Sequence, residues 1–320
     1  MLRRFIGRRL GLAVITLWVA SLVIFAATQV LPGDAAQAIL GRQAETDPQR
    51  LRILTRQLHL NRSPVEQYWH WLSGVLTGHL GTSLANGLPV SDLIGREIVN
   101  TAFLVAVSAA IGIPLAIGLG VVAAAMRDRT LDRVSSVGIL VLVALPEFVV
   151  GIGLTVLFGT SVWRVLPPTA TIAPGAAPWS DLNGLVLPVA TLVLVSMPYV
   201  SRITRGAMVE ALESEYVEFA TLRGESRTRV VLRYALPNAA PPVFQASAIS
   251  LAYLAGGAVI VEYIFAYPGI GQALVNAVTN RDVPVIQFIT LLLASFYIVL
   301  NLLADVATVL LTPKARAVQQ

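Results

Sequence analysis

The chain has 320 residues, of which 56% are hydrophobic and only 13% are charged. Soluble domains carry roughly 25% charged residues, so this composition argues against a soluble globular enzyme. The formal net charge is +5 and there is no cysteine, which excludes a disulfide framework, a thiolate metal site and a cysteine nucleophile. The one lysine, Lys314, follows Pro313 and therefore cannot serve a GxxxxGK[ST] phosphate-binding loop.

Six stretches are long and apolar enough to cross a bilayer, because a helix needs about 20 residues to span ~30 Å of hydrocarbon. They cover residues 10–31, 101–126, 134–163, 185–201, 243–261 and 283–304. Glu147 interrupts the third of them. The sequence therefore predicts an all-α membrane protein with six transmembrane helices.

The positions of the basic residues predict the orientation of these helices. If the N-terminus is cytoplasmic, the inner segments hold most of the arginines, whereas the two short outer loops hold only Arg164 and Arg281. Short loops rich in Lys and Arg stay in the cytoplasm, so we expect both termini inside. This segregation also differs from a nucleic-acid-binding stripe, and no nucleic-acid partner is expected.

The spans divide the chain into four parts. We expect an N-terminal arm and first transmembrane helix at 1–31 and an extracytoplasmic segment with amphipathic helices at 32–100. A five-helix core at 101–312 follows, with a cytoplasmic loop at 202–242, and a cytoplasmic tail at 313–320 ends the chain.

Within the outer segment, Ser63-Pro64-Val65-Glu66 is a capping box with proline at the first helical position. An apolar stripe follows at helical spacing, made of Val65, Trp69, Leu72 and Leu76. The stripe fits either the membrane interface or packing against the outer ends of the spans. A shorter helix is expected to begin near Asp47.

The cytoplasmic loop has the pattern of a docking element. Leu212, Tyr216 and Phe219 follow at i, i+4 and i+7, so a short helix presents one apolar face, and Gly224 ends it. Glutamates occupy the rest of this helix, at positions 210, 213, 215 and 218. The apolar face must be buried, either on a partner or beneath the chain's own bundle.

The spacing of this loop resembles a known motif. Glu218-Phe219-Ala220, three residues, Gly224, nine residues and Tyr234-Ala235-Leu236-Pro237 are similar to the EAA motif of permease subunits of ATP-driven importers, E-A-A-x3-G-x9-I-x-L-P. Phe219 stands where the motif has its middle alanine, and Tyr234 where it has isoleucine.

The resemblance covers nearly the whole chain and narrows to the first permease subunit of dipeptide, oligopeptide and nickel importers. Further stretches similar to that family are Leu31-Pro32-Gly33-Asp34, Leu80-Gly81-Thr82-Ser83, Val261-Glu262-Tyr263-Ile264-Phe265, Pro268-Gly269-Ile270-Gly271, Arg281-Asp282 and Asn301-Leu302-Leu303-Ala304-Asp305.

The resemblance implies a type I ABC importer permease fold in the bacterial inner membrane. It implies a second homologous permease, two cytoplasmic ATPase subunits or domains, an extracytoplasmic substrate-binding protein and the lipid bilayer as partners. ATP and Mg would be held by the ATPase subunits, so no cofactor, metal or catalytic residue is expected on this chain. The coupling residues implied by the motif and its helix are Leu212, Tyr216, Glu218, Phe219, Ala220, Gly224, Leu236 and Pro237.

Glu147 is the one acidic residue deep in a predicted span. A charge there costs roughly 3 kcal/mol or more unless it faces a polar path or a partner, so it is a candidate for the translocation path. A structural hydrogen bond beside a Pro146 kink, or a position near the interface, are the alternatives. Glu262 is a second path candidate, although it and Asp305 lie near span ends, where solvated or capping roles are expected.

Two other classes of membrane protein are open alternatives. A stand-alone secondary transporter or channel would place several ionisable residues in its spans, and it has no need of the docking loop. An intramembrane enzyme would need a base beside a nucleophile, whereas His59, His70 and His79 all lie in the outer segment. Their spacing also matches no zinc-ligand pattern.

Overall fold

The computed structural model describes residues 2–30, 62–173 and 175–311. Within these ranges the chain is helical, and the only β pairing is an isolated bridge between Thr82 and Pro89. The helices, in chain order, are α1 (Leu2–Val30), α5 (Pro64–Leu76), α6 (Val90–Ala125), α7 (Thr130–Ala144), α8 (Glu147–Leu154), the π-helix η1 (Thr155–Thr160), α9 (Leu182–Leu212), α10 (Glu215–Leu222), α11 (Arg227–Arg229), the π-helix η2 (Val230–Ala235), α12 (Leu236–Ile264), α13 (Ile270–Thr279) and α14 (Val283–Leu311).

Five helical stretches are long and apolar enough to cross a membrane, and α7 with α8–η1 supplies a sixth if that bent pair is one span. This arrangement fits the predicted six spans, with the third broken by a bend of 106°. The bend falls at Leu145, whose backbone is extended, and Pro146. Proline disfavours helical geometry in the residue before it and lacks an N–H, so the continuous helix ends here.

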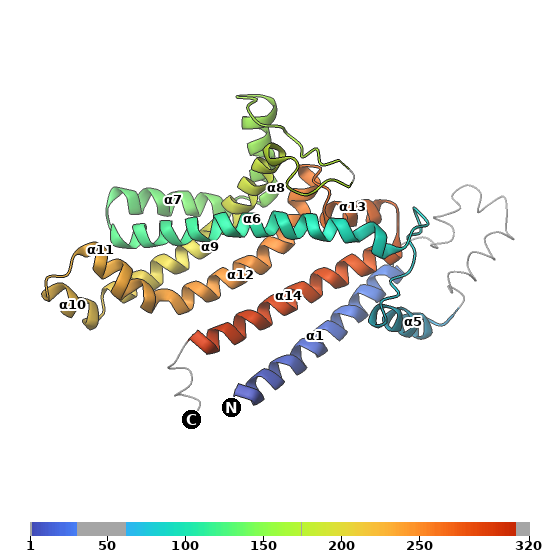
Figure 1. The fold of residues 1–320 in the computed structure, drawn as a ribbon, viewed down its shortest axis with the longest axis horizontal. Coiled ribbons are helices and arrows are strands. Elements are labelled where there is room, and N and C mark those ends of the chain that lie inside the picture. The colour runs from blue at the N-terminus through green and yellow to red at the C-terminus, as the bar shows by residue number, and fades with distance from the viewer. Residues whose placement is uncertain (1, 31–61, 174, 312–320) are drawn as a thin grey trace.

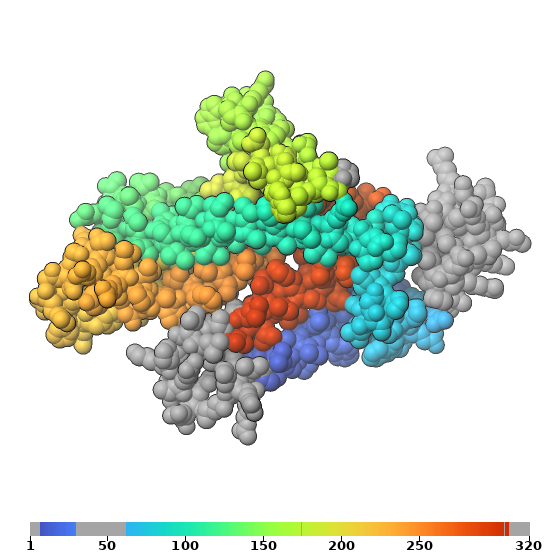
Figure 2. Space-filling model, in the orientation of Figure 1, coloured from blue at the N-terminus to red at the C-terminus, as the bar shows by residue number. Residues whose placement is uncertain are grey.

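The helices form two adjoining groups (Figure 1). Helices α6, α9 and α12 run alongside one another, and α1 pairs with α14, which also contacts α12. Helices α8 and η1 leave the bundle sideways, while α10 and α11 lie at one end and α5 and α13 near the other. In the space-filling view, the segment around α10 and α11 forms one tip of the molecule (Figure 2).

Small residues allow α6 and α9 to approach closely. A Cβ placed on Gly120 of α6 would lie 2.6 Å from Cβ of Thr204 and 2.7 Å from the carbonyl oxygen of Ser201 in α9. Glycine therefore lets the two backbones meet, as is common between membrane helices.

Ion pairs join the helices at the end of the bundle that contains α10. The guanidinium of Arg205 in α9 donates to both carboxylate oxygens of Asp132 in α7, at 2.6 and 2.8 Å. Arg9 of α1 pairs with Asp305 of α14 at 2.7 Å, so Asp305 is a paired residue. Arg9 and Asp305 lie near opposite ends of the sequence, so the start of α1 and the end of α14 lie on one side, as six spans require.

Helix α5 forms as predicted but buries another face. Ser63 Oγ accepts from the Glu66 N–H at 3.3 Å and Glu66 Oε2 accepts from the Ser63 N–H at 3.4 Å, which completes the capping box. The buried residue is Tyr68, whose ring packs on Phe25 of α1. Val65, Trp69 and Leu76 are exposed and Leu72 is half-buried, so three of the four residues of that stripe do not pack inward. The helix expected near Asp47 lies outside the described residues.

Candidate functional site

Helix α10 is anchored to the bundle by one apolar face. Val217 and Ala220 are each 4% exposed and belong to a buried cluster with Met208 and Ala211 of α9. Leu212, at the end of α9, packs against the same cluster. Packing beneath the chain's own bundle therefore accounts for this face of α10.

A second apolar face of α10 points away from the bundle. Tyr216 is 41% exposed, Phe219 66% and Leu222 75%. The predicted face thus divides, because Leu212 packs inward whereas Tyr216 and Phe219 face outward. Glu218 is exposed beside them. The sequence interpretation missed Leu222, although its position three residues after Phe219 places it on the same face.

Gly224 ends α10 in the way its sequence position predicts. Its N–H donates to the carbonyl of Thr221 at 3.0 Å, and the Glu225 N–H donates to the carbonyl of Ala220 at 3.3 Å. This is the paired hydrogen-bond pattern of a Schellman cap, whose first residue after the helix has positive φ. Gly224 has φ +80°, a conformation that glycine adopts without steric cost.

The segment after Gly224 ties α10 back to the bundle. Arg227 donates to the carbonyl of Ala125 at the end of α6, and Arg127 pairs with Glu213. Arg229 donates to Glu225 at 2.8 Å, and this hydrogen bond is the main cause that holds the pKa of the Glu225 carboxyl below its usual range. The short helices around α10 are thus held to α6 as well as to α9.

The segment between α9 and α12 is shorter than the predicted loop at 202–242. Helix α9 continues to Leu212 and α12 already begins at Leu236, with Pro237 in its first turn. The π-helix η2 runs into α12 without a break, since Ala235 and Leu236 both have helical backbone angles. Only residues 213–235 lie between the two long helices.

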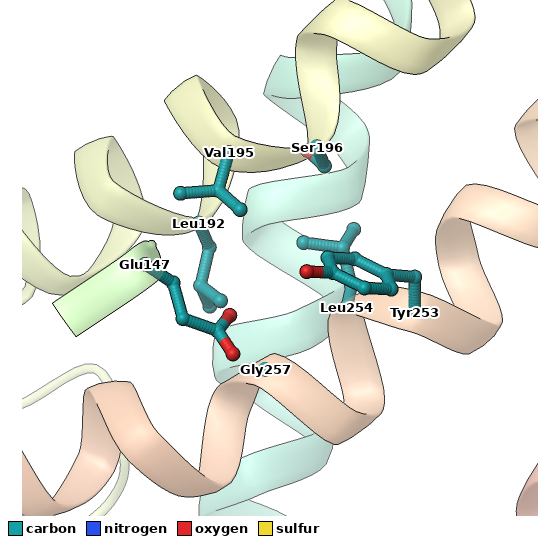
Figure 3. A pocket seen from close by; sticks show the side chains of 7 residues that line it. All are labelled: Glu147, Leu192, Val195, Ser196, Tyr253, Leu254 and Gly257. Atoms are coloured by element: carbon teal, nitrogen blue, oxygen red, sulfur yellow. The ribbon is translucent and has the colours of Figure 1, made fainter. Parts of the chain in front are cut away.

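Glu147 is the first residue of α8, directly after the bend in the third span. It lines a crevice between α9 and α12, together with Leu192, Val195 and Ser196 from α9 and Tyr253, Leu254 and Gly257 from α12 (Figure 3). Its Oε2 atom is buried and has no hydrogen-bond partner in the described part of the chain. The kink beside Pro146 is thus confirmed, but a structural hydrogen bond does not satisfy this oxygen.

Glu262 is fully buried, so a solvated role for it is wrong. Its carboxyl group accepts from Thr101 Oγ1 at 2.6 Å and from the Gly271 N–H at 2.7 Å, at the start of α13. The expected capping role is therefore correct, since the first N–H groups of a helix need acceptors. Next to this cap, Asn100 Nδ2 donates to the Pro268 carbonyl at 2.7 Å.

Asp282 joins two motifs that are far apart in the sequence. The hydroxyl of Ser83 donates to one of its oxygens, and the Leu84 N–H donates to the other at 3.0 Å. Leu80-Gly81-Thr82-Ser83 and Arg281-Asp282 therefore meet at the start of α14. This contact fixes the hairpin before α6 to the last span.

The helical arrangement, the broken third span and the short helix at 215–222 can now be compared with known proteins. Residues 116–317 match the family described as binding-protein-dependent transport system inner membrane component, and residues 1–105 match its N-terminal membrane-component family. The chain belongs to this family. It is an inner-membrane permease of a binding-protein-dependent ABC importer, and the alternative of a stand-alone secondary transporter or channel does not fit.

Relatives match over the whole length of the permease. A probable peptide ABC transporter permease, y4tP of Sinorhizobium fredii, is 33% identical over 98% of this chain and 99% of its own. The glutathione transport system permease GsiC of Escherichia coli O6:H1 is 34% identical over 99% of both chains.

A solved structure supports the fold. The MetNI methionine ABC transporter, in inward-facing conformations, aligns with a TM-score of 0.56 and 18% identity, covering 69% of this permease and 96% of that chain. Membership of the family implies an ATPase and a substrate-binding protein as partners.

Proposed function

We propose that this permease imports peptides or similar small substrates, forming half of a translocation path with a second homologous permease. In the proposed complex, two cytoplasmic ATPase subunits or domains hold ATP and Mg, and a binding protein delivers substrate from the other side. The peptide and glutathione assignments in the names of the relatives support this substrate class. No cofactor or catalytic residue on this chain is part of the proposal.

The observation that carries the proposal is the pair of apolar faces on α10. Val217 and Ala220 anchor the helix, while Tyr216, Phe219 and Leu222 point outward. An outward apolar face on an amphipathic helix fits a hydrophobic groove of a partner. We assign Tyr216, Glu218 and Phe219 to contact with the ATPase.

The remaining coupling residues support α10 rather than contact the ATPase in this proposal. Leu212 and Ala220 pack it on the bundle, Gly224 ends it, and Leu236 with Pro237 begins α12. The ties from Arg227 to Ala125 and from Arg127 to Glu213 connect the segment to α6. Closure of the ATPase subunits would then move α6, α9 and α12 together, as a rigid-body change of access requires.

Co-purification tests the proposal. The permease is solubilised in mild detergent from its own host, as wild type and with Phe219→Ser, Leu222→Ser or Gly224→Pro. We expect wild type to bring down an ATPase and a second six-span protein. The variants should lose the ATPase and keep the second permease.

The matched control is Thr221→Ala, because Thr221 is exposed on the same helix but lies outside the apolar face. It should retain the ATPase. Recovery of the permease alone or only with itself, with transport persisting after ATP depletion, would contradict the proposal.

A further inference from the structure

Glu147 places a carboxylate in an apolar crevice with no partner for one of its oxygens. In the described part of the chain, no ion pair includes Glu147, and Oε2 is buried without a hydrogen bond. A buried polar group without a partner costs free energy, and an unpaired charge costs more. Such a group in a membrane protein points to a ligand or partner outside the chain.

The rest of the crevice suits a cation. Tyr253 supplies an aromatic ring and a hydroxyl, and Figure 3 shows this hydroxyl directed toward the side of the crevice where Glu147 lies. Leu192, Val195 and Leu254 make the walls apolar. A carboxylate beside a phenol ring attracts an ammonium group through charge, a hydrogen bond and the ring face. None of the described residues that line the crevice is basic.

Glu147 lies at the bend in the third span and against the backbone of α12. The carboxylate follows the 106° bend between α7 and α8, and a Cβ placed on Gly257 would lie 2.5 Å from its Oε2 atom. Glycine at 257 thus lets the carboxylate rest against the backbone of α12. The crevice is narrow in this conformation, so binding of a ligand group would require α8 and α12 to separate.

We propose that Glu147 and Tyr253 form a transient site for a primary ammonium group, such as the amino terminus of a peptide, along the translocation path. The inference rests on the proposed import function and names the substrate group that this subunit recognises. Glu147 supplies the charge, Tyr253 supplies the ring face and hydroxyl, and Gly257 provides room for the carboxylate.

The absence of cysteine in the chain allows a test that needs no known substrate. Val195, which lines the crevice, is replaced by cysteine in the assembled complex, with either Glu147 or Glu147→Gln. Two methanethiosulfonate reagents of similar size, one with a trimethylammonium and one with a sulfonate group, are applied with and without ATP. The modified permease is followed by intact mass.

We expect the cationic reagent to react faster next to Glu147, and Glu147→Gln to lower the cation-to-anion rate ratio by roughly tenfold, since a nearby unit charge changes such rates by this order. Glu147→Asp keeps the charge and should keep the preference. A cysteine at exposed Thr279, far along the chain on α13, provides the control, and its ratio should not respond to Glu147→Gln.

Each other outcome would overturn the proposal. An unchanged ratio in Glu147→Gln would mean that no free carboxylate faces the path. A ratio near one that becomes anion-preferring in the variant would mean that a fixed cation of the partner permease neutralises Glu147. No modification in any state would mean that the crevice never opens. All three results leave the docking of the ATPase on α10 untouched, so the two proposals fail separately.

Discussion

The hydroxyl of Thr101 donates to the carboxyl of Glu262 at 2.6 Å, joining α6 to α12 at a point where both side chains are buried. The same hydroxyl oxygen accepts from the Ile270 N–H at 2.9 Å. Thr101 and Glu262 therefore hold the first turn of α13 between two spans. The stretches 261–265 and 268–271 thus share a structural role, which is to fix the turn that precedes the last span.

Replacing Thr101 with valine should loosen this turn. Valine keeps the shape of threonine but removes the donor to Glu262 and the acceptor for Ile270. We expect the free energy of unfolding to fall by about 1–3 kcal/mol, the usual cost of leaving buried polar groups unpaired. The measurement is the denaturation of the purified complex in detergent. Thr279→Val, at an exposed site, should change little, and equal effects at both positions would contradict this account.

The effect of a substitution at Gly224 on coupled transport should depend on how well the new residue tolerates a positive φ, and not on side-chain size alone. Alanine at φ +80° costs about 1 kcal/mol or more, valine costs more, and asparagine is the residue that tolerates this conformation best after glycine. Transport coupled to ATP hydrolysis should therefore decline in the order glycine, asparagine, alanine, valine. The assay is substrate uptake per ATP hydrolysed in proteoliposomes, and wild-type coupling with valine would show that the cap is dispensable.

The Asp132–Arg205 pair should stabilise the packing of α7 on α9. The carboxylate of Asp132 is buried and accepts two hydrogen bonds from the guanidinium of Arg205. A double-mutant cycle with Asp132→Ala and Arg205→Ala should give a coupling energy of roughly 1–3 kcal/mol, as expected for residues in one network. The exposed Arg229–Glu225 pair is the reference, and surface pairs contribute little. Equal coupling in both pairs would refute the structural role.

The hydrogen bonds of Asp181, on the outer side of the fold, predict that the stability of the protein depends on pH. Hydrogen bonds from the N–H groups of Thr171 and Gly184, each at 2.9 Å, hold the pKa of the Asp181 carboxyl below its usual range. A lowered pKa means that the ionised group stabilises the fold above the unfolded value of about 3.9. This stabilisation is lost as the pH falls through the folded pKa.

The comparison of wild type with Asp181→Asn measures this effect. Wild type should have the higher melting temperature at pH 6, and the difference should shrink as the pH falls below about 4. A difference that stays constant with pH would show that the charge of Asp181 is not involved.

The number of spans could be predicted from the sequence, but the ends of several helices could not. The fourth apolar stretch ends near Ser201, whereas α9 continues to Leu212. Hydropathy reports where the apolar segment ends, while the helix continues through its own hydrogen bonds into the polar region. The bend in the third span could be predicted from one residue, because Pro146 breaks the helix.

The buried contacts of the motifs could not be predicted from one sequence. Glu262 meets Thr101 across 161 positions, and Asp282 meets Ser83 across 199. No periodicity links such pairs, so the acidic residue near a span end suggested exposure to water. The division of α10 into an anchored face and an outward face was hidden for a similar reason, since the packing of α9 decides which residues are covered.

The central claim is that the outward face of α10 contacts the ATPase. Since the chain has no cysteine, Phe219→Cys can carry a photoactivatable thiol-linked cross-linker at one defined position, with buried Val217→Cys as the control. We predict a cross-linked product with a P-loop ATPase from position 219 in the native membrane and none from position 217. No ATPase product from position 219, with the complex intact, would contradict the account.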